Sequence, residues 1–177
     1  LSRLPNVIIT TFGDLLKVPG SYSSLQQARA DGSDIRIVYS ALEALDIARQ
    51  NPERKVAFVG IGFETTAPGI AASILQAESE NLGNYHVLSL HKLTPPVIRA
   101  LLDSGETRID GIVCPGHVST ITGSKPYEFI PRDYSIGCVI SGFEPLDILL
   151  CISMLVDQIE SQQPKVEIAY RRAVRPE

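Results

Sequence analysis

The feature that most constrains the fold of this sequence is a series of short, continuous apolar runs that alternate with stretches of helical periodicity. Such runs, about four to eight residues long, are typical of strands buried on both faces of a parallel sheet. They lie at Val7 to Thr10, Ile35 to Tyr39, Val56 to Gly60, His86 to Leu90, Gly111 to Cys114 and Gly137 to Ile140. This β-α-β-α order predicts an α/β protein with parallel sheets flanked by helices, in a Rossmann-like three-layer arrangement.

The stretches between these runs carry apolar residues at helical spacing. The stripes are Ala41, Ala44, Leu45 and Ala48, then Ile70, Ala71, Ile74 and Ala77, then Val97, Ile98, Leu101 and Leu102. Ser40 is a candidate N-cap of the first helix. The stretch from about Pro145 to Ile159 is apolar on most sides, which predicts a deeply buried helix.

Two breaks in the pattern predict where the chain crosses between lobes. Turn-forming residues gather at Lys17 to Ser21 and again between Val118 and Ser135. We therefore expect a central α/β lobe at residues 18–132, with residues 1–17 and 133–177 forming part of a neighbouring lobe. Because the chain begins without Met and stops after a structured-looking stretch, we also expect a fragment of a longer protein.

Charge and cysteine content exclude several classes of protein. A net charge of −4 argues against binding to a nucleic-acid backbone, so the cluster Arg171, Arg172 and Arg175 is interpreted as a solvated face or a partner contact. No apolar run approaches the roughly 20 residues of a membrane span, and no signal peptide is visible. Three widely spaced cysteines without a Cys-x-x-Cys pair indicate a reducing cytoplasm, with most thiols serving as small core residues.

Uncommon polar residues follow the predicted strands. Since ligands of parallel sheets gather beyond the carboxyl ends of the strands, we expect these residues to share one edge. They are Thr10, Thr11 and Asp14 after the first strand, Glu64, Thr65 and Thr66 after the third, His91 after the fourth, His117 and Ser119 after the fifth, and Glu144 after the sixth.

One strand-to-helix turn, Gly-Phe-Glu, occurs twice, at Gly62 to Glu64 and at Gly142 to Glu144. Each Glu could be a helix cap and nothing more, since a carboxylate is favoured at a helix N-terminus. Alternatively, the two carboxylates face one cleft between two similar lobes, where they bind a cation, a partner or a proton. Gly60-Ile61-Gly62 lacks the third glycine of a dinucleotide-binding loop and is followed by Glu64, which argues against nucleotide binding.

The histidines and cysteines leave several readings open. His117 follows Pro115-Gly116 and suits either a structural role, acid-base chemistry or metal ligation. His91 is either a cap or surface imidazole or part of the site, whereas His86 begins a strand at the opposite edge. Cys114 is either a buried strand residue or a nucleophile paired with His117. No complete metal-ligand spacing exists in the chain.

Taken together, five short blocks resemble the central part of the HypD family. They are Thr10 to Asp14 with Val18 to Ser21, Gly62 to Pro68, Pro115 to Ser119, Ser141 to Leu149, and Tyr170 to Arg172. The resemblance implies a cytoplasmic scaffold that helps to assemble the Fe(CN)2CO centre of nickel-iron hydrogenases, an accessory factor more than a turnover enzyme. It implies as partners a HypC-type small chaperone and a HypE-type cyanide donor, with no nucleic acid and no membrane.

The resemblance also implies which residues matter. Its motif residues carry over to Thr10, Thr11, Asp14, Glu64, Thr65, Thr66, His117, Glu144 and Asp147, as cleft walls or a docking surface. The iron-ligating cysteine, the redox cysteine pair and the [4Fe-4S] cysteines of the family would lie before Leu1 or after Glu177. We therefore expect no iron or cluster to be bound by this chain alone.

Two other functions compete with this reading. One is a free-standing α/β transferase or hydrolase in which His117 is the base and Glu64 or Glu144 is the acid. The other is a pure interaction module whose polar edge only docks a partner.

Overall fold

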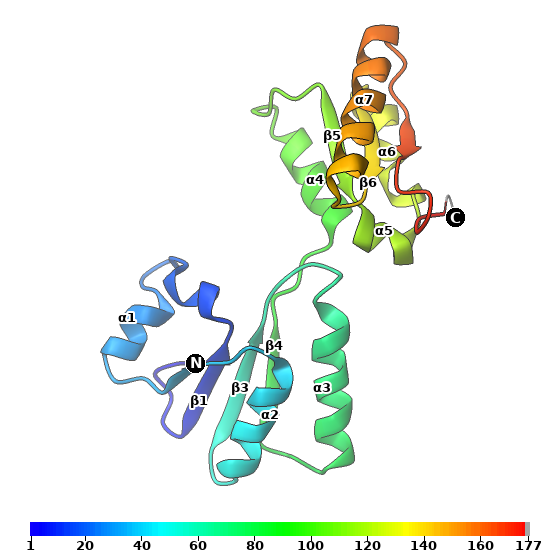
Figure 1. Cartoon of the computed structure of the whole chain (residues 1–177). Coiled ribbons are helices and arrows are strands. Elements are labelled where there is room, and N and C mark those ends of the chain that lie inside the picture. Colours follow the sequence, from blue (N-terminus) through cyan, green and yellow to red (C-terminus); the bar gives the residue numbers. More distant parts are fainter. Residues whose placement is uncertain (176–177) are drawn as a thin grey trace. The chain divides into compact units, whose positions relative to one another are not determined.

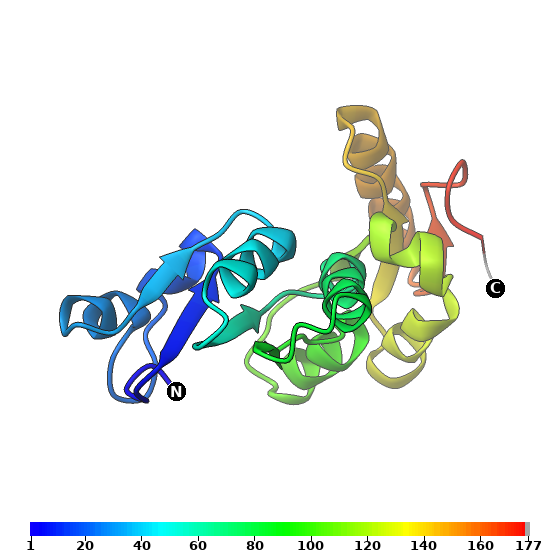
Figure 2. The ribbon, with the colours of Figure 1, turned by 90° about the horizontal axis from the view of Figure 1, so that it is seen from below.

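Two parallel sheets, each with its own helices, form the chain. The computed structural model describes residues 1–175 and divides into two units, Leu1–Lys92 and Leu93–Glu177. Figure 1 labels most of the helices and strands, and Figure 2 shows the same ribbon from below. The predicted α/β class with parallel sheets flanked by helices is confirmed.

The first unit holds a four-stranded sheet in the order β2-β1-β3-β4, with every neighbouring pair parallel. Its elements, in chain order, are β1 (Val7–Thr11), the 3-10 helix η1 (Gly13–Lys17), α1 (Leu25–Ala30), β2 (Ile35–Ile37), α2 (Ala41–Gln50), β3 (Lys55–Gly60), α3 (Ala67–Ser79) and β4 (Tyr85–Ser89).

Successive residues of the central strands face opposite sides of this sheet. Ile8 and Phe58 pack in one core cluster with the buried residues of α2 and α3. Ile9 and Ala57 pack on the other side with Leu16 of η1. Both faces are therefore covered, which is why these strands are apolar without alternation and why the unit has three layers.

Helix α2 forms as its sequence predicts. The stripe Ala41, Ala44, Leu45 and Ala48 is entirely buried. Ser40 is the N-cap, because its hydroxyl oxygen accepts a hydrogen bond from the backbone N–H of Glu43 at 3.2 Å. The carboxylate of Glu43 in turn accepts from the backbone N–H of Tyr39 at 2.9 Å.

The second unit holds a three-stranded parallel sheet in the order β5-β6-β7. Its elements are α4 (Thr94–Asp103), β5 (Gly111–Pro115), α5 (Gly116–Thr122), the 3-10 helix η2 (Lys125–Tyr127), α6 (Phe129–Tyr134), β6 (Gly137–Ser141), α7 (Pro145–Ser161) and β7 (Val166–Ile168). Strand β7 is not among the six predicted strands, because it has only three half-buried residues after a polar loop.

All three cysteines are free, buried and in the second unit. Cys114 and Cys138 belong to one core cluster, and Cys151 belongs to a second cluster with Val139 and Leu155. A hydrogen bond with Cys138 and, as the second cause, burial both raise the pKa of the Cys114 thiol. The expectation that the thiols are core residues is confirmed, and Cys114 has neither the exposure nor the thiolate character of a nucleophile.

The division into units differs from the expected boundaries at 17/18 and 132/133. Strand β1 is hydrogen-bonded between β2 and β3, so residues 1–17 lie in the same unit as the strands that follow them. The turn-rich stretch from Val118 to Ser135 folds into most of α5, η2 and α6 within the second unit. The boundary lies instead between Lys92 and Leu93.

The expectation that α7 is deeply buried is wrong. Only Asp147, Cys151, Leu155 and Gln158 are buried, whereas Leu146 and Leu149 are 76% and 64% exposed. The physical reason is that α7 packs on one face of a narrow sheet, against β5 and β6. The predicted apolar stripes of α3 and α4 are likewise only partly buried, with Ile74 and Leu101 exposed.

The N-cap of α2 gives a direct test of the first unit. We expect Ser40→Ala to lower the free energy of unfolding by about 1 kcal/mol, because the N–H of Glu43 loses its acceptor. Amide hydrogen exchange in α2 measures the change. Ser21→Ala is the control, since Ser21 is exposed and makes no side-chain hydrogen bond with the described residues. Equal exchange rates in both variants would contradict the capping role.

Candidate functional site

The predicted site residues lie at or beyond the carboxyl ends of strands, but of two different sheets. The first unit carries Thr10, Thr11, Asp14, Glu64, Thr65, Thr66 and His91, and the second carries His117, Ser119, Glu144 and Asp147. The expectation of one shared edge is therefore corrected, because each parallel sheet has its own carboxyl edge. One Gly-Phe-Glu turn follows β3, and the other follows β6.

In the first unit, the turn after β3 depends on Gly62. Its φ of +146° and the Thr66 side chain, which occupies the space of a Cβ, make this position strained for any other residue. The half-buried Glu64 lies inside the turn, while Thr66 occupies the N-cap position of α3. The N-cap position of α3 is therefore two residues beyond Glu64.

His91 lies against this turn, which brings two predicted site segments together. Its Cε1 atom is 3.2 Å from the position of a Cβ on Gly60. Its Nδ1 atom lies 2.9 Å from the hydroxyl oxygen of Ser89, while Nε2 is buried without a partner among residues 1–175. The N–H of Lys92 donates to the carbonyl of Gly62 at 3.0 Å, so the chain after β4 folds over the turn. His91 is thus neither a cap nor a surface imidazole.

The end of β1 and the residues that follow it lie beside the same turn. Thr10 and Thr11 are fully buried, and the hydroxyl of Thr11 has no partner within the described part of the chain. A pocket of about 480 Å³ lies between η1 and the Gly62 turn, and its lining includes Phe12, Asp14 and Thr66. The first unit therefore assembles most of its predicted site residues around one turn.

In the second unit, His117 lies in the first turn of α5 and is exposed. Its ring centroid is 4.5 Å from that of Phe143 and 6.5 Å from that of Tyr170. Ser119 is buried, and its hydroxyl donates to the carbonyl of Pro115 at 2.7 Å, which stabilises the helix start.

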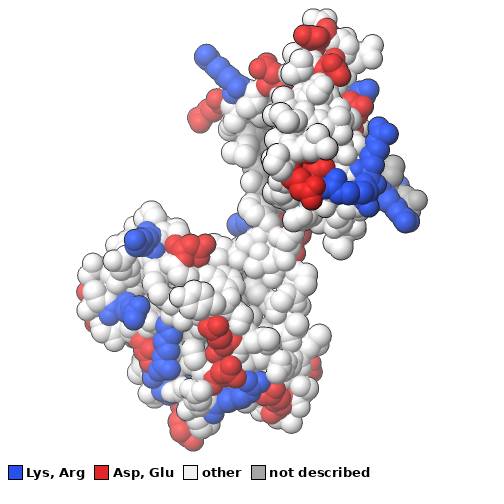
Figure 3. Space-filling view, viewed as in Figure 1, with Lys and Arg blue, Asp and Glu red and all other residues white. Residues whose placement is uncertain are grey.

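The second Gly-Phe-Glu turn is tied to the end of the chain by an arginine. Glu144 is the N-cap residue of α7, but its side chain makes no capping hydrogen bond and pairs with Arg172 at 3.2 Å. Asp147 is buried and accepts two hydrogen bonds from Arg172, at 2.6 and 2.7 Å. These bonds, against the opposing effect of burial, lower the pKa of the Asp147 carboxyl, with a smaller contribution from the backbone of Glu144. Acidic and basic surfaces meet in the second unit in Figure 3.

Tyr170 and Arg172 are the participants that sequence reasoning did not single out as site residues. They follow β7, the strand that the sequence did not predict. The arginine cluster was interpreted as a solvated face or a partner contact. Arg172 is indeed 52% exposed, and its guanidinium also pairs with Asp147 and Glu144 within the chain. The block Tyr170 to Arg172 could have indicated these residues. Because β7 was not predicted, the sequence did not show that this block follows a strand of the same sheet.

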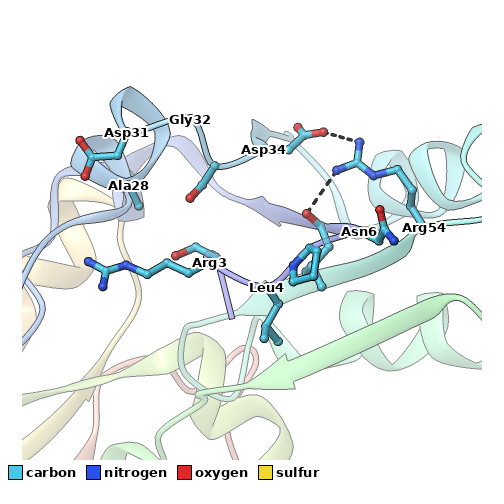
Figure 4. Close-up of a pocket in the computed structure, with 12 residues that line it drawn as sticks. Arg3, Leu4, Asn6, Ala28, Asp31, Gly32, Asp34 and Arg54 are labelled. Carbon is cyan, nitrogen blue, oxygen red and sulfur yellow. Dashed lines mark hydrogen bonds and ion pairs between the residues drawn. The ribbon is translucent and has the colours of Figure 1, made fainter.

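A further pocket, of about 620 Å³, lies at the opposite end of the first sheet and contains none of the predicted site residues. Figure 4 shows Arg54 there, donating to Asp34 at 2.7 Å and to the carbonyl of Val7 at 3.3 Å. Hydrogen bonding from Arg36, reinforced by Arg54, holds the pKa of Asp34 at about 2. This network fastens the amino ends of the strands.

Within residues 1–175, no group of three or more His, Cys, Asp or Glu side chains is arranged to hold a metal ion. Over the same residues, no helix combines the length and the apolar character that crossing a membrane demands.

Comparison with known proteins gives consistent matches. The family model described as "HypD: Hydrogenase formation hypA family" matches residues 1–177. The hydrogenase maturation factor HypD of Rhodobacter capsulatus is 50% identical over 170 residues, which are 96% of this chain and 45% of that protein. HypD of Escherichia coli is 46% identical over 96% of this chain and 46% of its own length. A putative hydrogenase expression/formation protein of Methanocaldococcus jannaschii is also 46% identical, over 96% and 47%. The chain spans about half the length of these relatives.

The crowding at Gly142 predicts a large effect of one methyl group. A Cβ there would meet the carboxylate of Asp147 and lie 2.8 Å from the ring of Tyr170. We expect Gly142→Ala to lower the free energy of unfolding of the second unit by about 1–3 kcal/mol through overpacking. Hydrogen exchange of the β6 amides measures it. Gly69→Ala, where a Cβ has no neighbour within 4 Å, is the control; a Gly142 variant as stable as this control would show that the turn can yield.

Proposed function

The chain belongs to the HypD family of hydrogenase maturation factors, and from this membership we propose that it forms part of a scaffold for assembly of the Fe(CN)2CO centre of nickel-iron hydrogenases. The observation that carries the proposal is the family match over all 177 residues together with the position of the matched blocks. The blocks that resemble the family begin in the last residues of β1, β5 and β6 or shortly after β3 and β7, at the carboxyl ends of the two sheets. Loops at such ends are where α/β proteins bind their ligands.

In this proposal each unit supplies one wall or docking surface. The first presents the turn after β3, with Glu64, Thr65 and Thr66, and His91 against it. The second presents exposed His117 and Phe143 next to Glu144. Aromatic side chains and hydrogen-bonding groups side by side on rigid elements suit the binding of partner proteins. The partners we propose are a HypC-type chaperone and a HypE-type cyanide donor, in the cytoplasm.

The iron centre is cargo in this proposal, and its ligands come from outside residues 1–177. The cysteines of this chain do not fit the role of ligands to iron or to a [4Fe-4S] cluster. They are 0% exposed, packed in the core, and Cys114 and Cys151 have raised pKa values, so the thiolate that a metal requires is disfavoured. The structural contribution of this chain is therefore to shape the surface around the iron, with no metal step assigned to its own residues.

Substitution of one candidate in each unit tests the proposed walls. We expect Glu64→Gln or His117→Gln, introduced into the gene that carries this chain, to abolish hydrogenase maturation without unfolding the protein. Hydrogenase activity in the host and circular dichroism of the purified variant give the two readouts. Matched controls are Glu53→Gln and His86→Gln, at the amino ends of β3 and β4. Normal maturation with either site variant would refute the role of that residue.

Iron titration tests the proposal that the ligands of the iron lie outside residues 1–177. We expect the 177-residue chain to show no tight stoichiometric binding of Fe²⁺, because its thiols are buried and no three-ligand group is present among residues 1–175. Anaerobic equilibrium dialysis with metal analysis measures the bound iron. A filled site at one iron per chain would mean that ligands of this chain were overlooked.

A further inference from the structure

The segment after β7 carries an aromatic ring to the carboxyl ends of β5 and β6. The N–H groups of Ala169 and Tyr170 both donate to the carbonyl of Ile140, at 3.0 and 3.2 Å. The chain then turns, and the N–H groups of Ala173 and Val174 donate back to the carbonyl of Tyr170, at 3.2 and 3.0 Å. The backbone of Tyr170 is therefore fixed from both sides.

Two glycines leave the space that this ring occupies. A Cβ on Gly116 would lie 2.8 Å from Cδ1 of Tyr170, and a Cβ on Gly142 would lie 2.8 Å from Cδ2. Real carbon atoms do not approach so closely without displacement, so the ring lies between the turn after β5 and the turn after β6. Those turns carry His117 and Glu144.

Arg172 holds the same ring from another direction. Its guanidinium carbon lies 4.5 Å from the centroid of Tyr170, which is a cation–π contact. The guanidinium is itself fixed by its two hydrogen bonds to buried Asp147 at the start of α7. The ring is thus connected to all three loops that follow β5, β6 and β7.

The imidazole of His117 depends on this arrangement. It lies 6.5 Å from the Tyr170 ring at an interplanar angle of 52°, and 4.5 Å from the Phe143 ring at 46°. Both distances fall within the range of attractive aromatic pairs. Within the described part of the chain no hydrogen bond to the ring nitrogens of His117 accompanies these contacts, so aromatic packing sets the direction of the ring.

We propose that Tyr170 is the positioning residue of His117. Its ring contacts Arg172 and fits between the two turns because residues 116 and 142 are glycines. The ring thereby fixes the position of the exposed imidazole. The contribution comes from the aromatic ring, since the hydroxyl makes no hydrogen bond with residues 1–175. The inference rests on the proposed function for the use of His117 and on geometry alone for its position.

Nuclear magnetic resonance of the whole 177-residue chain tests this position. The chain has three histidines, and two of them, His86 and His91, lie in the first unit and serve as internal references. The Cε1–H signal of His117 is assigned by its loss in His117→Gln. Neighbouring rings shift such a signal, so its chemical shift reports the packing of His117 directly.

We expect Tyr170→Ala to move the His117 signal while the His86 and His91 signals stay in place. Tyr170→Phe, which keeps the ring, should restore the wild-type signal. Arg172→Gln should move it in the same direction as Tyr170→Ala. If Tyr170→Ala does not fold, Tyr170→Leu replaces it, because Leu fills space without an aromatic ring. An unmoved His117 signal in a folded variant without the ring would overturn the proposal, as would failure of Phe to restore it.

Hydrogenase activity of the host separates this inference from the proposed function. We expect maturation to be lost with Tyr170→Ala and retained with Tyr170→Phe. Normal maturation together with a displaced His117 signal would leave the positioning role intact and refute the use of His117 in maturation.

Discussion

Parallel strand pairing is the constraint on which the rest of this molecule depends. In a parallel sheet every strand ends at the same edge, so loops from distant parts of the sequence are brought together without any contact between their side chains. The pairing of β3 with both β1 and β4 places the turn after Gly60 beside His91 and the residues after β1. The pairing of β6 with β5 and β7 does the same for His117, Glu144 and Tyr170.

The strands and their polar ends were predictable because they follow from local chemistry. The apolar run Val56 to Gly60 differs by one residue from the observed β3, Lys55–Gly60. The partners of each strand were not predictable, because nothing in the sequence of β1 states that it lies between β2 and β3. The unit boundary was missed for that reason. The exposure of Leu149 was missed because periodicity shows which residues are apolar and not how many elements cover them.

The two Gly-Phe-Glu turns show how far a repeated tripeptide determines structure. Gly62 adopts a positive φ, whereas Gly142 is required because Asp147 and Tyr170 crowd it. Glu64 lies inside its turn, whereas Glu144 is the N-cap residue of α7. The position of each turn was therefore predictable from the sequence. The role of each residue in it was not, because that role depends on neighbours such as Arg172, which follows a strand that was not predicted.

The three cysteines have a practical consequence that follows from where they are buried. All the thiols of the chain lie at Cys114, Cys138 and Cys151, each with 0% exposure and all within the second unit. An alkylating reagent can reach these thiols only when the second unit opens. The rate of labelling therefore measures the opening of the second unit and does not report the opening of the first. The native cysteines therefore report the unfolding rate of the second unit without an engineered probe.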